Sequence, residues 1–222
     1  MIVHDGFEDG FYNQNGIGPI RIPKEWVAAW WDGDHDTDRG VQFFRRPEYA
    51  EKYQTREVYA GDYAANVFAA SSVHNAVLMR GFNIGSGRLL TAEVMSMIVG
   101  NKGSGHEMRI GVSPAGGVDW EDSSVVWGGW YSTFMDEFED RAWVRQFVTT
   151  RSTGDWVTVI LHSRNVYYNV WSHAHWDEFV LTCESDDPEP PEPPVPPPPG
   201  GEFDWERLAR AHEAFAAVLR GG

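Results

Sequence analysis

Short runs of apolar or alternating residues recur along the first 184 positions, and clusters of Gly, Asn, Asp and Ser separate them. This pattern is typical of β-strands joined by turns. The runs cover residues 2–7, 67–70, 76–84, 89–99, 107–112, 125–127, 143–149, 156–162 and 176–181. No stretch before Phe203 keeps a 3.6-residue apolar period. Nine or so strands without helices predict an all-β fold, a β-sandwich over residues 1–184.

Two of these runs indicate how their strands are buried. In the run 156–162, Val157, Val159 and Leu161 fall on one face, which predicts a strand with that face in the core. In the run 89–99, apolar residues occupy both faces near its end. That strand is therefore expected to be central in its sheet and covered on each side.

A proline-rich tract follows the predicted sandwich. Nine of the thirteen prolines lie between Pro188 and Pro199. Proline favours the extended polyproline II conformation and cannot donate to a hydrogen-bonded ladder. Residues 185–201 are therefore predicted to form a stiff linker, whose proline-rich part spans roughly 37 Å at ~3.1 Å per residue.

The last segment, residues 202–222, is predicted to form one α-helix. Its apolar residues return at spacings of three and four and form a single stripe; the stripe includes Leu208, Phe215, Val218 and Leu219. An isolated helix of about 17 residues is marginal in water, so the stripe is expected to dock. The partner is either the chain's own sandwich or another subunit of a protein assembly, and the stiff linker favours another subunit.

The composition limits the kinds of partner that the protein is expected to bind. The formal net charge is −15 and no basic run is longer than the pair Arg45 and Arg46, which argues against a nucleic-acid partner. No apolar run approaches the ~18 residues of a membrane span, and the first residues lack the basic and apolar segments of a secretory signal. The single cysteine, Cys183, rules out an internal disulfide and a multi-cysteine zinc site.

The segment 32–38 places aspartate at every second position. An EF-hand loop needs glycine at its sixth position and glutamate at its twelfth. Counted from Asp34, these positions hold Arg39 and Arg45, and no helices are predicted on either side. The tract is therefore predicted to be a solvated loop, and a looser calcium site is the alternative.

Two further patterns bear on chemistry. His173 and His175 would place two imidazoles on one face of a strand, which suits zinc, but no third ligand can be named from the sequence. Hydrogen-bonded or ligand-facing histidines are the alternative. The nucleophile pattern G-x-S-x-G has no match, because the Gly-Ser-Gly triplets at Ser86 and Ser104 have the wrong spacing. We therefore expect no catalytic centre.

An ordered set of segments runs through residues 1 to about 183. It comprises V-x-D-G-F-E-D-G-F at 3–11, the tryptophans at 26, 30 and 31, R-P-E-Y at 46–49, AGDYA at 60–64, SVHNA at 72–76, MRIGVSPAGG at 108–117, VVW at 125–127 and HAHWDEFVL at 173–181. This set resembles the carbohydrate-binding-module-like jelly rolls, which are β-sandwiches of the galactose-binding type. The resemblance implies a jelly-roll fold.

The resemblance also implies a structural calcium ion between the first strand and the start of the last. The matching residues are Glu8 and Asp177. A hard cation collects carboxylate and carbonyl oxygens, and both ends of a sandwich domain can supply them. The alternative is that both are ordinary surface acids.

Sugar binding in such modules uses aromatic rings and polar side chains on the concave sheet or the loops at its rim. The positions that match are Trp30, Trp31, His74, Arg109, Trp127, Asn169 and His175. Arg109 lies in the middle of a predicted strand, where a buried unpaired charge would be costly. It is therefore expected to pair internally or to face a groove. For each tryptophan, packing in the core is the alternative.

These patterns favour a non-catalytic structural or adhesion protein of a larger assembly, such as a virion decoration, a tail or a surface fibre. The expected location is a virion or an extracellular surface. The C-terminal helix would anchor the protein to other subunits, and glycan contact would be an additional property of the sandwich. The alternative is a secreted polysaccharide-binding module associated with a glycoside hydrolase.

Overall fold

The computed structural model describes residues 1–13, 21–30, 48–53, 57–68, 74–100, 105–132, 143–165 and 172–184. Contacts divide the chain into two units, Met1–Glu184 and Ser185–Gly222, and every described residue lies in the first unit. The predicted linker and C-terminal helix, with the predicted docking residues Leu208, Phe215, Val218 and Leu219, lie outside the described residues.

The described residues form strands and connecting segments without a helix, as the sequence predicts. The strands are β1 (Ile2–Asp5), β2 (Phe11–Asn13), β3 (Arg21–Pro23), β4 (Val27–Trp30), β5 (Glu48–Tyr53), β6 (Tyr63–Phe68), β7 (His74–Asn83), β8 (Leu89–Gly100), β9 (His106–Ser113), β10 (Val126–Trp127), β11 (Val144–Arg151), β12 (Trp156–Asn165) and β13 (Ser172–Cys183). Each of the nine predicted runs overlaps one strand; β2, β3, β4 and β5 were not predicted. Over the described ranges, no helix is long and apolar enough to cross a bilayer.

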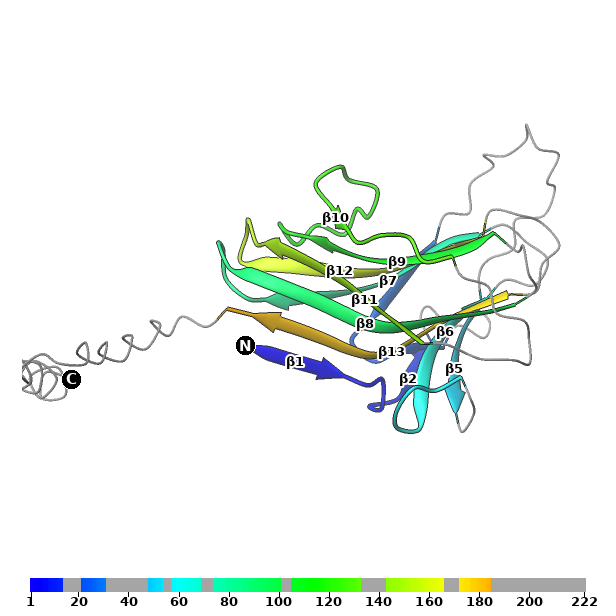
Figure 1. The fold of residues 1–222 in the computed structure, drawn as a ribbon. Helices are drawn as coiled ribbons and strands as arrows, with labels where there is room; N and C mark the ends of the chain where they lie inside the picture. Colours follow the sequence, from blue (N-terminus) through cyan, green and yellow to red (C-terminus); the bar gives the residue numbers. More distant parts are fainter. Residues whose placement is uncertain are drawn as a thin grey trace, which may run out of the picture. The chain divides into compact units, whose positions relative to one another are not determined.

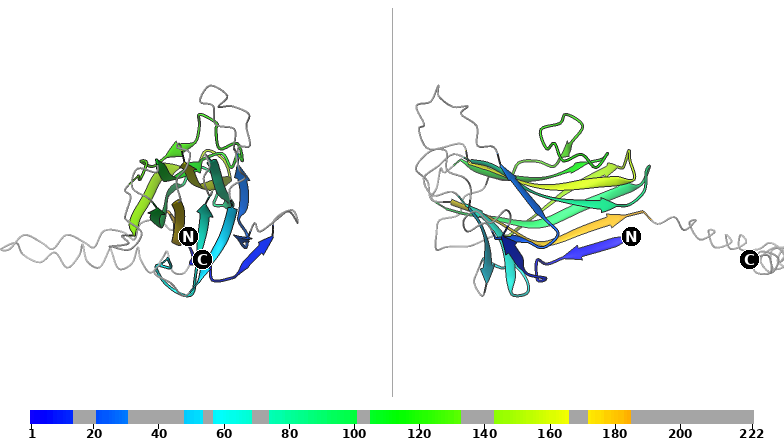
Figure 2. Two further views of the ribbon diagram at one scale, coloured as in Figure 1. Left: turned by 90° about the vertical axis from the view of Figure 1, so that its right-hand side faces the viewer. Right: turned by 180° about the vertical axis from the view of Figure 1, so that it is seen from behind.

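Two sheets stack face to face, which confirms the sandwich (Figure 1). The β8 sheet has the order β11-β8-β13-β6-β5, and β1 also pairs with β13. The β12 sheet has the order β10-β9-β12-β7-β4, and β2 and β3 form a separate pair. Figure 2 shows the same two layers from the side and from behind.

The core fills the space between the sheets. Val157, Val159 and Leu161 on β12 are buried there, as their alternation predicts. Strand β8 lies between β11 and β13, and its residues from 96 to 99 are buried whichever face they point to. Its predicted central position is therefore confirmed. The aromatic part of the core includes Trp26, which meets Phe179 edge to face at 5.3 Å between ring centroids.

Strand β13 changes partners halfway along its length. Its first half pairs with β6 and its second half with β1, while β8 runs along its other edge. A β-bulge between Asp177 and Val180 marks the change, and Glu178 adopts a positive φ of 48° there. The amino group of Met1 also donates to the carbonyl of Cys183 at 3.0 Å, so the two ends of the sandwich lie side by side.

Candidate functional site

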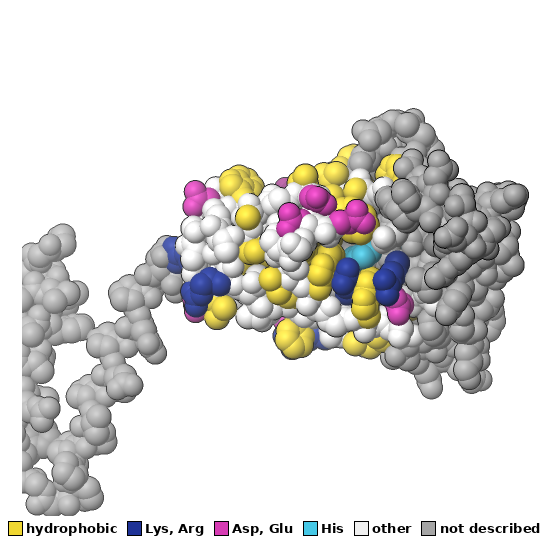
Figure 3. All heavy atoms as spheres, turned by 90° about the horizontal axis from the view of Figure 1, so that it is seen from above, with side chains coloured by type: hydrophobic (Ala, Val, Ile, Leu, Met, Phe, Trp, Pro, Cys, Tyr) yellow, Lys and Arg dark blue, Asp and Glu magenta, His cyan; other side chains and the backbone are white. Residues whose placement is uncertain are grey.

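The outer face of the β12 sheet carries a second set of side chains. On β12, the residues that alternate with the core positions are Trp156, Thr158, Ile160, His162 and Arg164. On β9, Glu107, Arg109 and Gly111 take the same side. Figure 3 looks onto this face from above and shows hydrophobic, basic and acidic side chains gathered on it.

A connecting segment crosses the middle of this face. Trp120 and Val125 from this segment pack with Val77, Met79 and Ile160 in a small apolar cluster that is separate from the main core. The segment therefore divides the face into two regions. One lies beside the start of β12 and the other beside its end.

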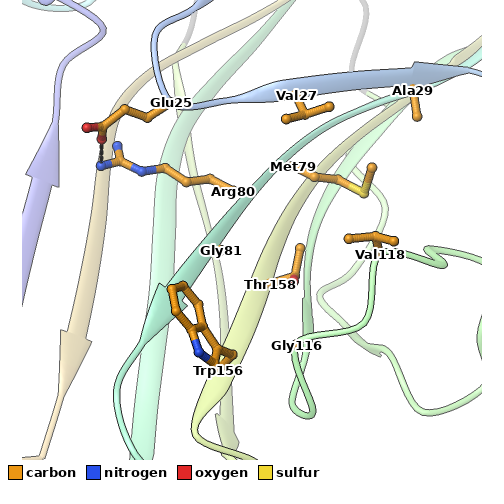
Figure 4. Close-up of a pocket in the computed structure, with 10 residues that line it drawn as sticks. All are labelled: Glu25, Val27, Ala29, Met79, Arg80, Gly81, Gly116, Val118, Trp156 and Thr158. Carbon is orange, nitrogen blue, oxygen red and sulfur yellow. Dashed lines mark hydrogen bonds and ion pairs between the residues drawn. The ribbon is translucent and has the colours of Figure 1, made fainter.

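The first region is a groove, which we call the Trp156 groove (Figure 4). It has a volume of about 530 Å³ and is lined by Glu25, Val27, Ala29, Met79, Arg80, Gly81, Gly116, Val118, Trp156 and Thr158. Trp156 is 54% exposed, Val27 is 50% exposed and Val118 is 72% exposed. The groove thus exposes large apolar side chains to solvent.

Two glycines hold Trp156 in place. A Cβ atom at Gly81 would lie 3.7 Å from the indole ring, so the ring rests on the backbone of β7. Gly116 has a φ of +75°, and a Cβ atom there would lie 2.8 Å from the Cβ of Trp156. A side chain at position 116 would therefore push Trp156 away. The backbone of β7 therefore supports one side of the indole ring, and Gly116 leaves room for the Cβ and backbone of Trp156.

Polar groups flank the same groove. Arg80 donates from Nη1 to Asp5 Oδ2 at 2.6 Å and forms a second ion pair with Glu25. Asp5 also accepts a hydrogen bond from Trp26 Nε1 at 2.8 Å, which ties this cluster to the core. The side chain of Arg80 is held on both sides, whereas the side chain of Glu25 is 66% exposed. Glu25 can therefore accept hydrogen bonds from a ligand in the groove.

The second region brings together two residues predicted to bind ligand, Arg109 and Trp127. The guanidinium carbon of Arg109 lies 3.7 Å from the centroid of Trp127 and 4.1 Å from that of Trp130. Arg164 lies over Trp130 in turn, at 3.9 Å. We call this stack, Trp127–Arg109–Trp130–Arg164, the cation–aromatic ladder; hydrophobic and basic side chains alternate in a row in Figure 3. Glu107 pairs with Arg164 at 2.6 Å.

His162 supports the ladder from below. Arg109 donates from Nε to His162 Nδ1 at 3.1 Å, and His162 Nε2 lies 2.5 Å from Asn75 Oδ1. This pairing requires a neutral imidazole with its proton on Nε2. Burial, followed by the charges of Arg109 and Arg164, holds the pKa of His162 well below its usual value. Burial and then Arg164 also lower the pKa of Arg109, to about 10.

The other predicted ligand-binding residues lie elsewhere. Trp30 packs against the main core. His74 is 2% exposed and lies between the sheets, and His175 is 0% exposed. Both histidines are therefore buried, and their predicted role in ligand binding stays a prediction. Trp31 and Asn169 lie outside the described residues.

The rings of His173 and His175 stack with centroids 5.9 Å apart, so the predicted placement of both on one face of a strand is confirmed. In the part of the chain that the structure describes, no three or more His, Cys, Asp or Glu side chains are grouped so as to hold a metal ion. The histidine pair therefore forms no zinc site with described residues alone.

Glu8 and Asp177, the predicted calcium ligands, both accept hydrogen bonds from backbone amides of residues 59–63, which lead into β6. Asp177 Oδ2 accepts from Tyr59 N at 2.8 Å and Ala60 N at 3.1 Å. Glu8 Oε1 accepts from the next amides along, Asp62 N and Tyr63 N, at 2.9 Å each. Burial raises the pKa of Asp177 to about 6 despite its backbone hydrogen bonds. These carboxylates order a loop, and calcium at this place stays a prediction.

Sequence reasoning missed Trp156, His162 and Arg164. The alternation that places Val157, Val159 and Leu161 in the core puts Trp156 and His162 of the same run on the opposite face. Arg164 continues this alternation beyond the end of the run. Val118 lies in a connecting segment, where no periodic pattern identifies a groove residue.

No protein-family model matches the sequence, and no curated protein matches it. Solved structures do resemble it. TmCBM61, solved in complex with β-1,4-galactotriose, is 13% identical with a TM-score of 0.51, over 81% of this chain and 94% of that one. The K1 cleaved adhesin domain of Lys-gingipain from Porphyromonas gingivalis W83 is 11% identical with a TM-score of 0.51, over 83% of this chain and 99% of that one.

These similarities concern the fold. They establish that the described sandwich has the fold of carbohydrate-binding modules and related adhesin domains, as the ordered sequence segments predict.

Proposed function

We propose that this protein is a non-catalytic glycan-binding module that holds a carbohydrate in the Trp156 groove. One observation carries the proposal: Trp156 is 54% exposed at the edge of a groove of about 530 Å³ on the outer face of the β12 sheet. Flat aromatic rings stack on the apolar C–H faces of sugars. Pockets of about 300 to 1,000 Å³ are typical of small-molecule sites.

The polar residues of the groove suit the other half of sugar recognition. The exposed carboxylate of Glu25 can accept hydrogen bonds from hydroxyl groups, and Arg80 fixes Glu25 in place. One structure with this fold, TmCBM61, was solved with β-1,4-galactotriose. A β-1,4-galacto-oligosaccharide is therefore the first neutral probe to use.

Isothermal titration with this probe tests the proposal. Trp156→Ala is expected to weaken binding roughly tenfold, because an aromatic stacking contact is worth about 1.5 kcal/mol. Phe147→Ala is the matched control, since Phe147 is also an exposed aromatic residue, 57% exposed, but lies on β11 of the other sheet. Equal affinities for Trp156→Ala and the unaltered protein would contradict the proposal.

The proposal extends to a role in a larger assembly, such as a virion decoration, a tail or a surface fibre, with residues 202–222 as the anchor. The apolar stripe of that segment and the proline-rich linker before it support this role. Deleting residues 203–222 should leave a folded sandwich that binds the same glycans and no longer joins the assembly. Full incorporation of the shortened chain would show that residues 203–222 are not the anchor. The alternative function is a secreted polysaccharide-binding module associated with a glycoside hydrolase.

A further inference from the structure

Arg109 is held in an unusual way on the outer face of the β12 sheet. Trp127 and Trp130 cover the two faces of its guanidinium group, at 3.7 and 4.1 Å from the ring centroids. Its Nε donates to His162 Nδ1. Among the described residues, no acceptor binds the two terminal Nη nitrogens. The edge of the guanidinium group therefore keeps its donors for a ligand.

Among the described residues, no carboxylate forms an ion pair with Arg109, and the carboxylate that acts on its charge is that of Glu107. Arg164 stands beyond Trp130 in the ladder, and Glu107 is already paired with Arg164 at 2.6 Å. The next group inward, His162, is neutral as an acceptor from Arg109. A partly buried cation that shares its one described carboxylate neighbour with Arg164 is costly, and a bound anion would lower that cost. A guanidinium edge also fits the two oxygens of a carboxylate or sulfate side by side.

We propose that the edge of Arg109 in the cation–aromatic ladder is a second glycan subsite, which takes a negatively charged sugar substituent, either a carboxylate or a sulfate ester. The glycan nature of this ligand rests on the proposed function, whereas the subsite is separate from the Trp156 groove. Trp127 and Trp130 exclude water from both faces of the guanidinium group and so strengthen its bond to the anion.

The charge pattern around the subsite limits the ligand further. Asp119, Glu121 and Asp122 lie exposed on the segment that crosses the same face, and the whole chain has a net charge of −15. These charges repel a dense polyanion at long range. The subsite therefore suits a sugar with an isolated acidic group.

A crossed comparison of two variants and two ligands tests the inference. The acidic probes are galacturonate and galactose 6-sulfate, the neutral probe is the β-1,4-galacto-oligosaccharide, and binding is measured by titration calorimetry or saturation-transfer NMR. Arg109→Gln should weaken binding of both acidic sugars at least tenfold, as expected for loss of a charge-assisted pair, and leave the neutral probe unaffected. Trp156→Ala should do the reverse.

Arg109→Lys keeps the positive charge and loses the two-pronged edge, so it should give an intermediate affinity for the acidic sugars. Comparing the two variants also distinguishes the loss of a ligand contact from a folding defect. Thermal melting of both variants measures any folding defect. Equal binding of the acidic sugars by Arg109→Gln and the unaltered protein would overturn the subsite, and so would inorganic sulfate binding as tightly as galactose 6-sulfate. Failure of the neutral probe alone would overturn the Trp156 groove instead.

Discussion

Acidification from pH 7 to pH 5 should destabilise the sandwich, because histidines are buried in it as neutral groups. His74 Nε2 and His106 Nε2 both meet the hydroxyl of Ser163, at 3.0 and 2.7 Å, and His106 Nδ1 meets the hydroxyl of Ser172 at 2.7 Å. Burial lowers the pKa of His74 to about 3 and, with neighbouring histidines, holds the pKa of His106 well below its usual value.

The sign follows from proton binding. In the unfolded chain a histidine titrates near pH 6.5, so below that pH the unfolded state binds more protons than the folded state and the free energy of unfolding falls. Each histidine that stays neutral in the folded state lowers the free energy of unfolding by about 1.9 kcal/mol between pH 7 and pH 5. His74 and His106 together therefore cost about 4 kcal/mol over this range, a large share of the 5–15 kcal/mol typical of a domain.

Asp177 acts in the opposite direction. Its pKa is raised from 3.8 to about 6, so its contribution to stability is greatest below pH 3.8 and is lost as the pH rises through 6. Between pH 7 and pH 5, protonation of Asp177 raises the free energy of unfolding by about 1.3 kcal/mol. This is less than the loss from a single buried histidine, so the histidines decide the sign.

Urea unfolding followed by tryptophan fluorescence at pH 7, 6 and 5 measures the effect. His74→Leu removes one titrating group and leaves Ser163 paired with His106, so the loss of stability on acidification should shrink by about 1.9 kcal/mol. Phe147→Ala, an exposed change on β11 without a titrating group, should keep the pH dependence of the unaltered protein. A free energy of unfolding that is unchanged or higher at pH 5 would refute the reasoning.

Two further predictions concern the glycine beneath the ladder and the calcium site. A side chain at Gly111 would run into the ring of Trp127, so Gly111→Ala should lower stability by about 1–3 kcal/mol in thermal melts. Gly129→Ala, where a Cβ would meet nothing within 4 Å, should change it little, and equal melts for the two variants would contradict the packing. If Glu8 and Asp177 hold calcium, adding the ion should raise the melting temperature by mass action, and an unchanged melt after chelation would remove the site.

The fold could be predicted because its strands carry strong local signals. The alternation in β12 and the two-sided apolar run in β8 led directly to a core strand and a central strand, and both are observed. The missed strands β2, β3 and β4 have only three or four residues, too few for a period of two to stand out. Pairing with strands that are distant in sequence holds them in place, and the local sequence pattern contains no signal for such pairing.

The site was harder to predict because residue type does not determine burial. His74 and Arg109 were both assigned to ligand binding, yet His74 points between the sheets and Arg109 points outward. One residue of register on a strand separates these outcomes. Arg109 is expected from the sequence to pair internally or to face a groove, and it lies on the outer face, where it donates to His162. His74 has a hydroxyl partner inside, at Ser163.

Burial also distinguishes the tryptophans from one another, although the amino-acid composition gives no difference between them. Trp26 and Trp176 are fully buried in the core. In the ladder, Arg109 and Arg164 lie over the ring of Trp130. A ring whose faces are covered cannot stack on a sugar, whatever its place in the fold. Trp156 rests on the backbone of β7 and is 54% exposed, so among the described tryptophans on this face it is the one best placed to stack on a pyranose.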